Sequence, residues 1–253
     1  MTKPILDAVL VAAGKYHDID FARLELLKLL AEHENLRVRV ATDYADIDAI
    51  ARSKFLLTYT CDLRPTQAQQ DALAKYVSDG GRWVALHGTN AALDFTPKGV
   101  EAPRTIRTLA HTLGSQFVAH PPIQMYRVKT SAPNHPLVAG VGEFETDDEL
   151  YLSEYHEREK LTPLLETEYS GDAKGFVEAD WSHTKQHLVM YLRPLGKGAV
   201  LYNTLGHCRG HYDMRPVVDF YPTIERCSWG KPQYYELLRR SLRWALGDLQ
   251  SRE

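Results

Sequence analysis

Near its N-terminus the chain reads ILDAVLVAAG (residues 5–14), an apolar run that only Asp7 interrupts. A strand of this kind is buried on both faces, which is typical of the central strands of a parallel sheet. Apolar residues then recur at helical spacing behind Asp20, a suitable N-cap: Phe21, Leu24, Leu27 and Leu30. The stretch therefore predicts a strand, a loop and a helix in succession, the first unit of an α/β sheet.

The same alternation continues through the first third of the chain. Strands are predicted at residues 37–41, 55–59 and 83–86, with a short helix at residues 47–51. Another helix opens at Pro65-Thr66, where Thr66 and Gln69 form a capping box, and closes at Gly80-Gly81. Strands that alternate with helices predict a parallel sheet with right-handed crossovers. At 253 residues, one hydrophobic core suffices, so residues 1–253 are expected to form a single domain.

The rest of the chain is less regular. A helix is predicted at residues 104–113, ending at Gly114, and a strand at residues 124–129. Between Ser131 and Tyr155 turn residues dominate, and an acidic run, Glu145 to Glu149, lies within this segment. This pattern favours a long loop or a small insertion. Two hairpins and a terminal helix are predicted after it, at residues 164–179, 188–204 and 233–246.

Composition restricts the class of partner. The formal net charge is −3, whereas nucleic-acid-binding surfaces carry a basic excess, so no nucleic-acid partner is expected. The three cysteines form no CxxC pair, which suits a reducing compartment. The sequence contains neither an apolar run of about 20 residues nor a signal-peptide pattern, so it predicts a cytoplasmic protein without a membrane partner.

Six segments, in order along nearly the whole chain, resemble the ThuA-like (trehalose utilisation) family. They are GKYHD (14–18), GGRWVALH (80–87), GSQFVAHP (114–121), HPL (135–137) with DELY (148–151), GKG (196–198) through LGH (205–207), and RWA (243–245). The resemblance implies a flavodoxin-like three-layer sandwich with a mostly parallel central sheet, shared with class I glutamine amidotransferases. Those enzymes carry a Gly-x-Cys-x-Gly nucleophile elbow after a strand.

The elbow of this chain lacks the cysteine. The matching stretch is Ala85-Leu86-His87-Gly88-Thr89, with His87 where the family framework has its nucleophile. The later family histidine matches His207, but Arg209 stands where an acidic residue is expected. Without a thiolate at the elbow, glutamine hydrolysis is not expected.

Histidines dominate the predicted site, because several follow strands at the carboxyl edge, where open α/β sheets bind ligands. We predict His87, His207 and Asp18 as catalytic. The predicted substrate-binding residues are His17, Thr89, Asn90, His120, Glu149 and Tyr151. Structural alternatives stay open: His87 packed under a loop, Asp18 capping a helix, and the acidic run as a solvated face.

A rim rich in hydrogen-bonding groups and poor in fixed positive charge suits a neutral polyol. The resemblance likewise implies a small carbohydrate, such as a keto-sugar or glycoside, and imidazoles can supply acid–base chemistry on it. A non-catalytic sugar-binding or regulatory protein is the alternative. No cofactor is expected, but zinc or another divalent ion on His17, His87 and His207 would make the protein a metal-dependent hydrolase. A homodimer stays open, with the aromatic loop Tyr212–Trp229 as a surface or a lid.

Overall fold

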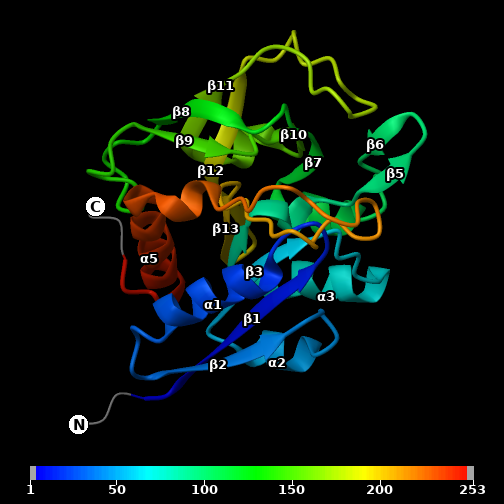
Figure 1. Cartoon of the computed structure of the whole chain (residues 1–253). Coiled ribbons are helices and arrows are strands. Elements are labelled where there is room, and N and C mark those ends of the chain that lie inside the picture. The colour runs from blue at the N-terminus through cyan, green and yellow to red at the C-terminus, as the bar shows by residue number, and fades with distance from the viewer. Residues whose placement is uncertain (1–3, 250–253) are drawn as a thin grey trace.

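The computed structural model describes residues 4–249 and is built around a nine-stranded mixed sheet (Figure 1). Five neighbouring strands run parallel, in the order β2 (Leu36–Ala41), β1 (Leu6–Gly14), β3 (Phe55–Cys61), β4 (Arg82–Leu86) and β13 (Gly198–Asn203). Four antiparallel strands extend the sheet: β12 (Gln186–Leu195), β11 (Thr162–Glu168), β8 (Gln124–Thr130) and β9 (Phe144–Asp148). The parallel half has the strand order of flavodoxin-like folds, so the predicted fold class is confirmed.

Helices cover both faces of the parallel half. One face carries α1 (Ile19–Leu30) and α5 (Pro232–Leu246), and the other carries α2 (Ile47–Arg52), α3 (Gln67–Ser78) and α4 (Arg107–Leu113). Strand β1 shows why, since Leu10 and Ala12 pack toward the first pair of helices while Val9 and Val11 pack toward the others. A strand buried on both faces needs apolar residues at every position, as the sequence pattern predicted.

Two small strand pairs and three 3₁₀ turns complete the described chain. Strands β5 (Asp94–Thr96) and β6 (Gly99–Glu101) form a projecting hairpin, and β7 (Ser115–Ala119) pairs with β10 (Leu152–Tyr155). The 3₁₀ turns are η1 (His87–Asn90), η2 (Arg158–Lys160) and η3 (Cys227–Gly230). None of the helices within residues 4–249 has the length and apolarity needed to cross a bilayer.

Several local predictions are confirmed. The Thr66 side chain accepts from the Gln69 backbone N–H while the Gln69 side chain accepts from the Thr66 N–H, which completes the capping box of α3. Gly114 ends α4 in the left-handed conformation, with φ 87°. The second predicted hairpin forms from β12 and β13.

Other local predictions are wrong. Asp18, not Asp20, caps α1, because its carboxylate accepts the Phe21 N–H. Helix α4 begins at Arg107 rather than at residue 104, because the backbone of Ile106, with φ −112° and ψ 44°, lies outside the helical region.

The two predictions for the aperiodic regions are also wrong. The acidic run is not a loop but forms most of β9, where buried and exposed residues alternate. Residues 164–179 do not form a hairpin by themselves, because β11 finds its antiparallel partners in β12 and β8 instead. The pairing of β9 with β8 and that of β11 with β12 and β8 each join strands that are far apart in the sequence, so turn residues alone could not predict them.

Candidate functional site

Four buried side chains meet at the carboxyl edge of the parallel strands. His17 follows β1, His87 follows β4, His207 follows β13, and Glu149 follows β9 of the antiparallel extension. We call His17, His87, His207 and Glu149 the histidine–glutamate cluster. One nitrogen or oxygen atom of each lies within 4.8 Å of the others.

His87 keeps the backbone geometry of an elbow. Its φ is 47°, a left-handed conformation that costs energy in a residue with a side chain. The next residue must be glycine, because a Cβ at Gly88 would lie 2.7 Å from the Thr60 carbonyl oxygen and 2.8 Å from the Cys61 Cβ. The end of β4 is therefore pressed against the end of β3, and this turn holds the His87 ring over the carboxyl edge.

The rings of His17 and His87 face each other closely, with 2.8 Å between their Nε2 atoms. Glu149 Oε2 lies 3.4 Å from His87 Nε2 and 3.8 Å from His17 Nε2. The Tyr151 hydroxyl also lies 3.1 Å from His87 Nε2. Burial lowers the pKa of His17 to about 3, even with the Glu149 carboxylate nearby, so this ring is neutral at ordinary pH.

His207 lies between two carboxylates. Its Nε2 is 2.8 Å from Glu225 Oε2, and its Nδ1 is 3.1 Å from Glu149 Oε1. Burial by itself would lower the pKa of His207, but these two carboxylates outweigh it and raise the pKa to about 9. Burial would likewise raise the pKa of Glu149, yet His120, His207 and His17 hold it well below the usual range.

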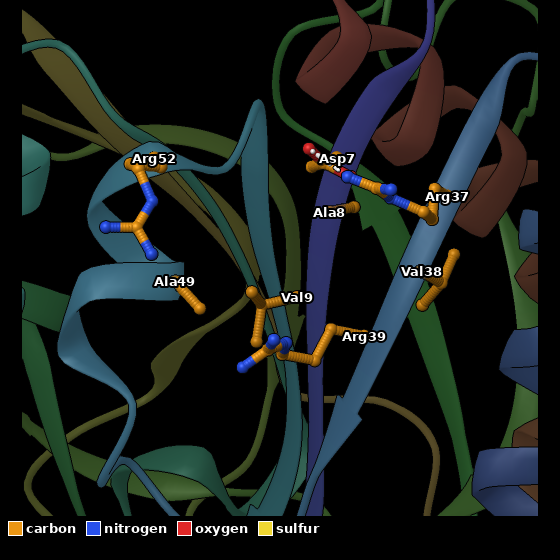
Figure 2. A pocket seen from close by; sticks show the side chains of 8 residues that line it. All are labelled: Asp7, Ala8, Val9, Arg37, Val38, Arg39, Ala49 and Arg52. Atoms are coloured by element: carbon orange, nitrogen blue, oxygen red, sulfur yellow. Dashed lines mark hydrogen bonds and ion pairs between the residues drawn. The ribbon is translucent and has the colours of Figure 1, made fainter.

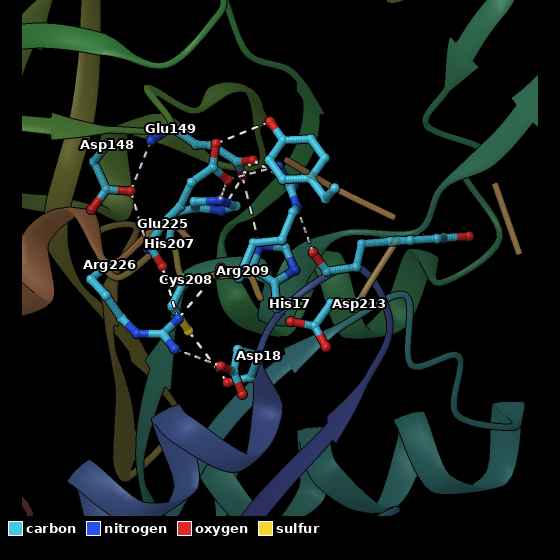
Figure 3. Close-up of polar contacts among 12 residues, drawn as sticks. His17, Asp18, Asp148, Glu149, His207, Cys208, Arg209, Asp213, Glu225 and Arg226 are labelled. Atoms are coloured by element: carbon cyan, nitrogen blue, oxygen red, sulfur yellow. Dashed lines mark hydrogen bonds and ion pairs between the residues drawn. The ribbon is translucent and has the colours of Figure 1, made fainter. Parts of the chain in front are cut away.

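A second buried carboxylate supports this arrangement. Asp148 Oδ1 accepts the backbone N–H groups of Glu149 and His207 at 2.8 and 3.1 Å. Its Oδ2 accepts those of Gly206 and Ser228 at 2.9 and 3.3 Å. Asp148 thus ties the end of β9 to the loop after β13 and to η3. Figure 3 shows its contacts with Glu149 and His207. Reading the acidic run as a solvated face missed this role of Asp148, because side chains alternate along β9: Asp147 is exposed and Asp148 is buried.

Glu225 was missed as well. The sequence suggested that Arg209 takes the place of the acid expected near His207, but Glu225 supplies that acid from 18 residues away. Paired backbone hydrogen bonds between Arg209 and Glu225, of 3.0 and 2.8 Å, bring it there. The Arg209 guanidinium then contacts Glu225 at 2.9 Å and Glu149 at 3.4 Å.

A cavity of about 240 Å³ opens beside the cluster. Its polar end includes His17, His120, Glu149 and Arg209. Its remaining wall includes Lys174 and Gly175 but is mostly apolar and aromatic: Tyr16, Cys61, Ala91, Leu93, Phe95, Val100, Phe117, Tyr151, Phe176 and Met214. His120 places its Nε2 3.5 Å from Glu149 Oε1 and keeps 22% of its side chain exposed.

Three predicted site residues do not reach this cluster or the cavity wall. Asp18 caps α1 and binds Arg226 at 2.8 Å, which is the structural role that the sequence left open. Thr89 and Asn90 are buried beneath the turn, where Thr89 donates to the Leu86 carbonyl oxygen and Asn90 donates to Ser115. They hold η1 in place and do not face the cavity.

The loop Tyr212–Trp229 has two sides. Met214 lines the cavity and Trp229 is buried, with its indole N–H donating to the Gly206 carbonyl oxygen. Tyr212 and Phe220, by contrast, are more than half exposed. The loop therefore forms part of the cavity wall, while its role as a lid or a dimer surface stays a prediction.

Another hollow, of about 500 Å³, lies at the edge strand β2 (Figure 2). Arginines line it, but Arg37 donates to Asp7 within the hollow and Arg39 is paired with Asp46. Its charges are thus largely neutralised, and the histidine–glutamate cluster remains the stronger candidate site.

Comparisons with known proteins agree with this architecture. The family model for ThuA, described as trehalose utilisation, matches residues 8–221. A thua-like protein from Bacteroides uniformis is similar at 17% identity, with a TM-score of 0.67 over 99% of this chain and 96% of that one. Another, from Parabacteroides merdae, is similar at 13% identity, with a TM-score of 0.61 over 99% and 93%.

More distant likeness reaches larger enzymes. A β-galactosidase from Rahnella sp. R3 is similar at 13% identity and a TM-score of 0.54, over 97% of this chain but 32% of that one. At such identities the likeness shows the fold alone. No curated protein gives a significant match.

Proposed function

Because this chain belongs to the ThuA family, we propose that it is an enzyme that acts on a small sugar or keto-sugar by acid–base chemistry. The reaction would take place in the 240 Å³ cavity beside the histidine–glutamate cluster. Glutaminase activity is not part of the proposal, since His87 occupies the position of the elbow nucleophile.

The observation that carries the proposal is the two-sided wall of this cavity. Tyr16, Phe117 and Phe176 offer aromatic surface to the C–H face of a sugar ring, while His120 and Arg209 offer hydrogen-bonding groups to its oxygens. Ligand pockets usually begin at about 300 Å³, so a cavity of this size suits one ring rather than a polysaccharide.

His120 is the best-placed base. Its Nδ1 lies 2.7 Å from the Pro121 carbonyl oxygen, so Nδ1 carries the hydrogen and Nε2 is free to accept a proton. Burial lowers the pKa of His120, which keeps the ring neutral and ready to act as a base at neutral pH. His87 and His207, which the sequence suggested for this role, are not among the described residues that line the cavity.

The proposed step is removal of a proton from the carbon beside a ketone. The proton passes to His120 Nε2, the electron pair of the C–H bond forms the C=C bond of an enolate, and the π pair of the carbonyl moves onto its oxygen, where Arg209 stabilises the negative charge. Where the deprotonated carbon bears a hydroxyl, the enolate oxygen takes the proton of that hydroxyl and the former carbonyl carbon takes the proton from His120, so the carbonyl group moves by one carbon and the sugar is isomerised. Where the carbon on the other side of the deprotonated carbon bears a leaving group, that group departs with its bonding electrons and the ketone re-forms, which gives elimination instead.

The test is proton exchange in D₂O, followed by NMR, with a panel of keto-sugars and glycosides. The wild-type protein should exchange hydrogen beside the ketone, and His120→Asn should lower the rate by about 10²–10⁴-fold. His33→Gln changes a histidine outside the site and should keep the wild-type rate. An unchanged rate in His120→Asn would refute the assignment. Tight binding without exchange or turnover would instead favour the sugar-binding alternative.

A further inference from the structure

We infer that the histidine–glutamate cluster is a binding site for one divalent transition-metal ion of the zinc type, held by His17, His87, His207 and Glu149. The inference deepens the proposed function, because it uses the same site. It depends on the arrangement of donor atoms and not on the identity of the sugar.

The first argument is the direction of two lone pairs. His87 Nδ1 lies 2.7 Å from the Thr204 carbonyl oxygen, and His17 Nδ1 lies 3.2 Å from the Lys15 carbonyl oxygen. A carbonyl oxygen only accepts, so each Nδ1 carries the hydrogen of its neutral ring. The two Nε2 lone pairs therefore face each other across 2.8 Å. Two acceptors at this distance repel unless a cation or a proton lies between them.

His207 has the same orientation toward the cluster. Its Nε2–H donates to Glu225, so Nδ1 is the ring nitrogen left for a metal ion, which would replace the hydrogen that Nδ1 carries in the protonated ring. Nδ1 is buried without a hydrogen-bond partner in the described chain, and it faces the Glu149 carboxylate. A histidine whose outer N–H is held by a carboxylate or a backbone carbonyl is typical of metal sites, where that bond orients the ring. All three imidazoles of the cluster show it.

The charges also favour a cation. Without a metal, the carboxylates of Glu149 and Glu225 are balanced by the Arg209 guanidinium and by a proton on His207, and a metal ion would take the place of that proton. Asp148 adds another buried carboxylate beside Glu149, compensated only by backbone N–H groups. A buried excess of negative charge is costly unless a cation balances it.

The donor set identifies the class of ion. Three imidazole nitrogens and one carboxylate oxygen suit zinc and its first-row neighbours, whereas calcium and magnesium prefer oxygen ligands throughout. Ligands about 2.1 Å from a tetrahedral ion lie about 3.4 Å apart. The donor atoms of the cluster are 2.8 Å apart at the His17–His87 pair and at most 4.8 Å apart overall. Small side-chain rotations are enough to bring them to that spacing.

The experiment is a direct measurement of metal content. The full chain is equilibrated with Zn²⁺, dialysed and analysed for metal, and its affinity is measured by competition with a coloured chelator. We expect one zinc per chain. His17→Asn and Glu149→Gln should each lose stoichiometric binding, while His211→Gln should keep it, because the His211 ring binds the Tyr221 carbonyl oxygen outside the cluster.

Glu225→Gln provides a second, milder variant. Glu225 orients His207 and is not a ligand, so this variant should keep one zinc per chain with an affinity about 10–100-fold weaker. Circular dichroism checks that each variant is folded. A folded wild-type protein that retains no zinc would overturn the inference, and a shared proton would then be the occupant of the cluster. Stoichiometric binding unchanged in both His17→Asn and Glu149→Gln would overturn it too.

The failure of this inference can be told apart from the failure of the proposed function. Zinc binding without any exchange or turnover of a sugar would support the metal site and count against the sugar chemistry. Sugar turnover by metal-free protein, unaffected by a chelator, would do the reverse.

Discussion

Replacing Asp148 by asparagine tests how strongly one buried carboxylate holds the site together. The two carboxylate oxygens accept four backbone N–H groups at 2.8–3.3 Å, two on each oxygen. Asparagine keeps one oxygen and turns the other into an NH₂ donor. Whichever way the amide is oriented, two of the four N–H groups then face a donor instead of an acceptor.

The magnitude follows from these two lost bonds. A hydrogen bond to a charged group contributes about 1.5–3 kcal/mol, so Asp148→Asn should lower the free energy of unfolding by about 3–6 kcal/mol. For a protein of this size the melting temperature should fall by roughly 6–24 °C. Asp147→Asn is the matched control, because the same change one residue away affects a side chain that is 52% exposed. It should stay within about 0.5 kcal/mol of wild type.

Urea unfolding followed by circular dichroism measures both variants. A loss below about 1 kcal/mol in Asp148→Asn, or equal losses in the two variants, would refute the reasoning that Asp148 organises this region. A folded Asp148→Asn protein should also bind zinc more weakly, since Asp148 fixes the backbone of both Glu149 and His207.

Further predictions concern packing, protonation and metal removal. Gly88→Ala should cost about 1–3 kcal/mol, because its Cβ has no room beside Thr60 and Cys61, while Gly230→Ala, with nothing within 4 Å, should be nearly neutral in the same unfolding assay. Burial lowers the pKa of His187 below its ordinary value of 6.5. Below that pH the histidine is protonated in the unfolded chain but not in the folded protein, so the free energy of unfolding falls as the pH falls. The stability difference between wild type and His187→Gln should therefore shrink from about pH 7 to about pH 5, and a constant difference would contradict this. In a sample whose free zinc concentration is about 100 times the Kd of the site, adding a chelator should lower the free energy of unfolding by about 2.7 kcal/mol and so lower the melting temperature. An unchanged melting curve would argue against a metal site in the folded protein.

The positions of the histidines could be predicted from the sequence because each follows a strand. The carboxyl ends of parallel strands meet at one edge, so His17, His87 and His207 were expected there, and the structure brings their rings together. Glu149 was expected from the family motif, and it joins them. Asp18 also follows β1, yet it points toward the helix that it caps, because adjacent residues in a loop need not face the same way.

The partners of these side chains could not be predicted. Glu225 lies in an aperiodic loop, and only the backbone pairing with Arg209 brings it to His207. Asp148 stands in a run of acids that looks solvated, and its burial depends on β9 pairing with β8, strands that are separated by a 13-residue connection. Neither contact leaves a periodic signal in the sequence.

The sequence by itself determined the α/β architecture, the absence of an elbow thiol and the edge of the sheet where the histidines lie. These follow from hydrophobic periodicity, capping residues and residue identity, which act over a few neighbouring positions. The tertiary structure alone decided which ring nitrogens point inward, which carboxylates are buried and which side chains line the cavity. Such choices depend on hydrogen-bond partners far away in the chain, and these are set only when loops and strands pack together.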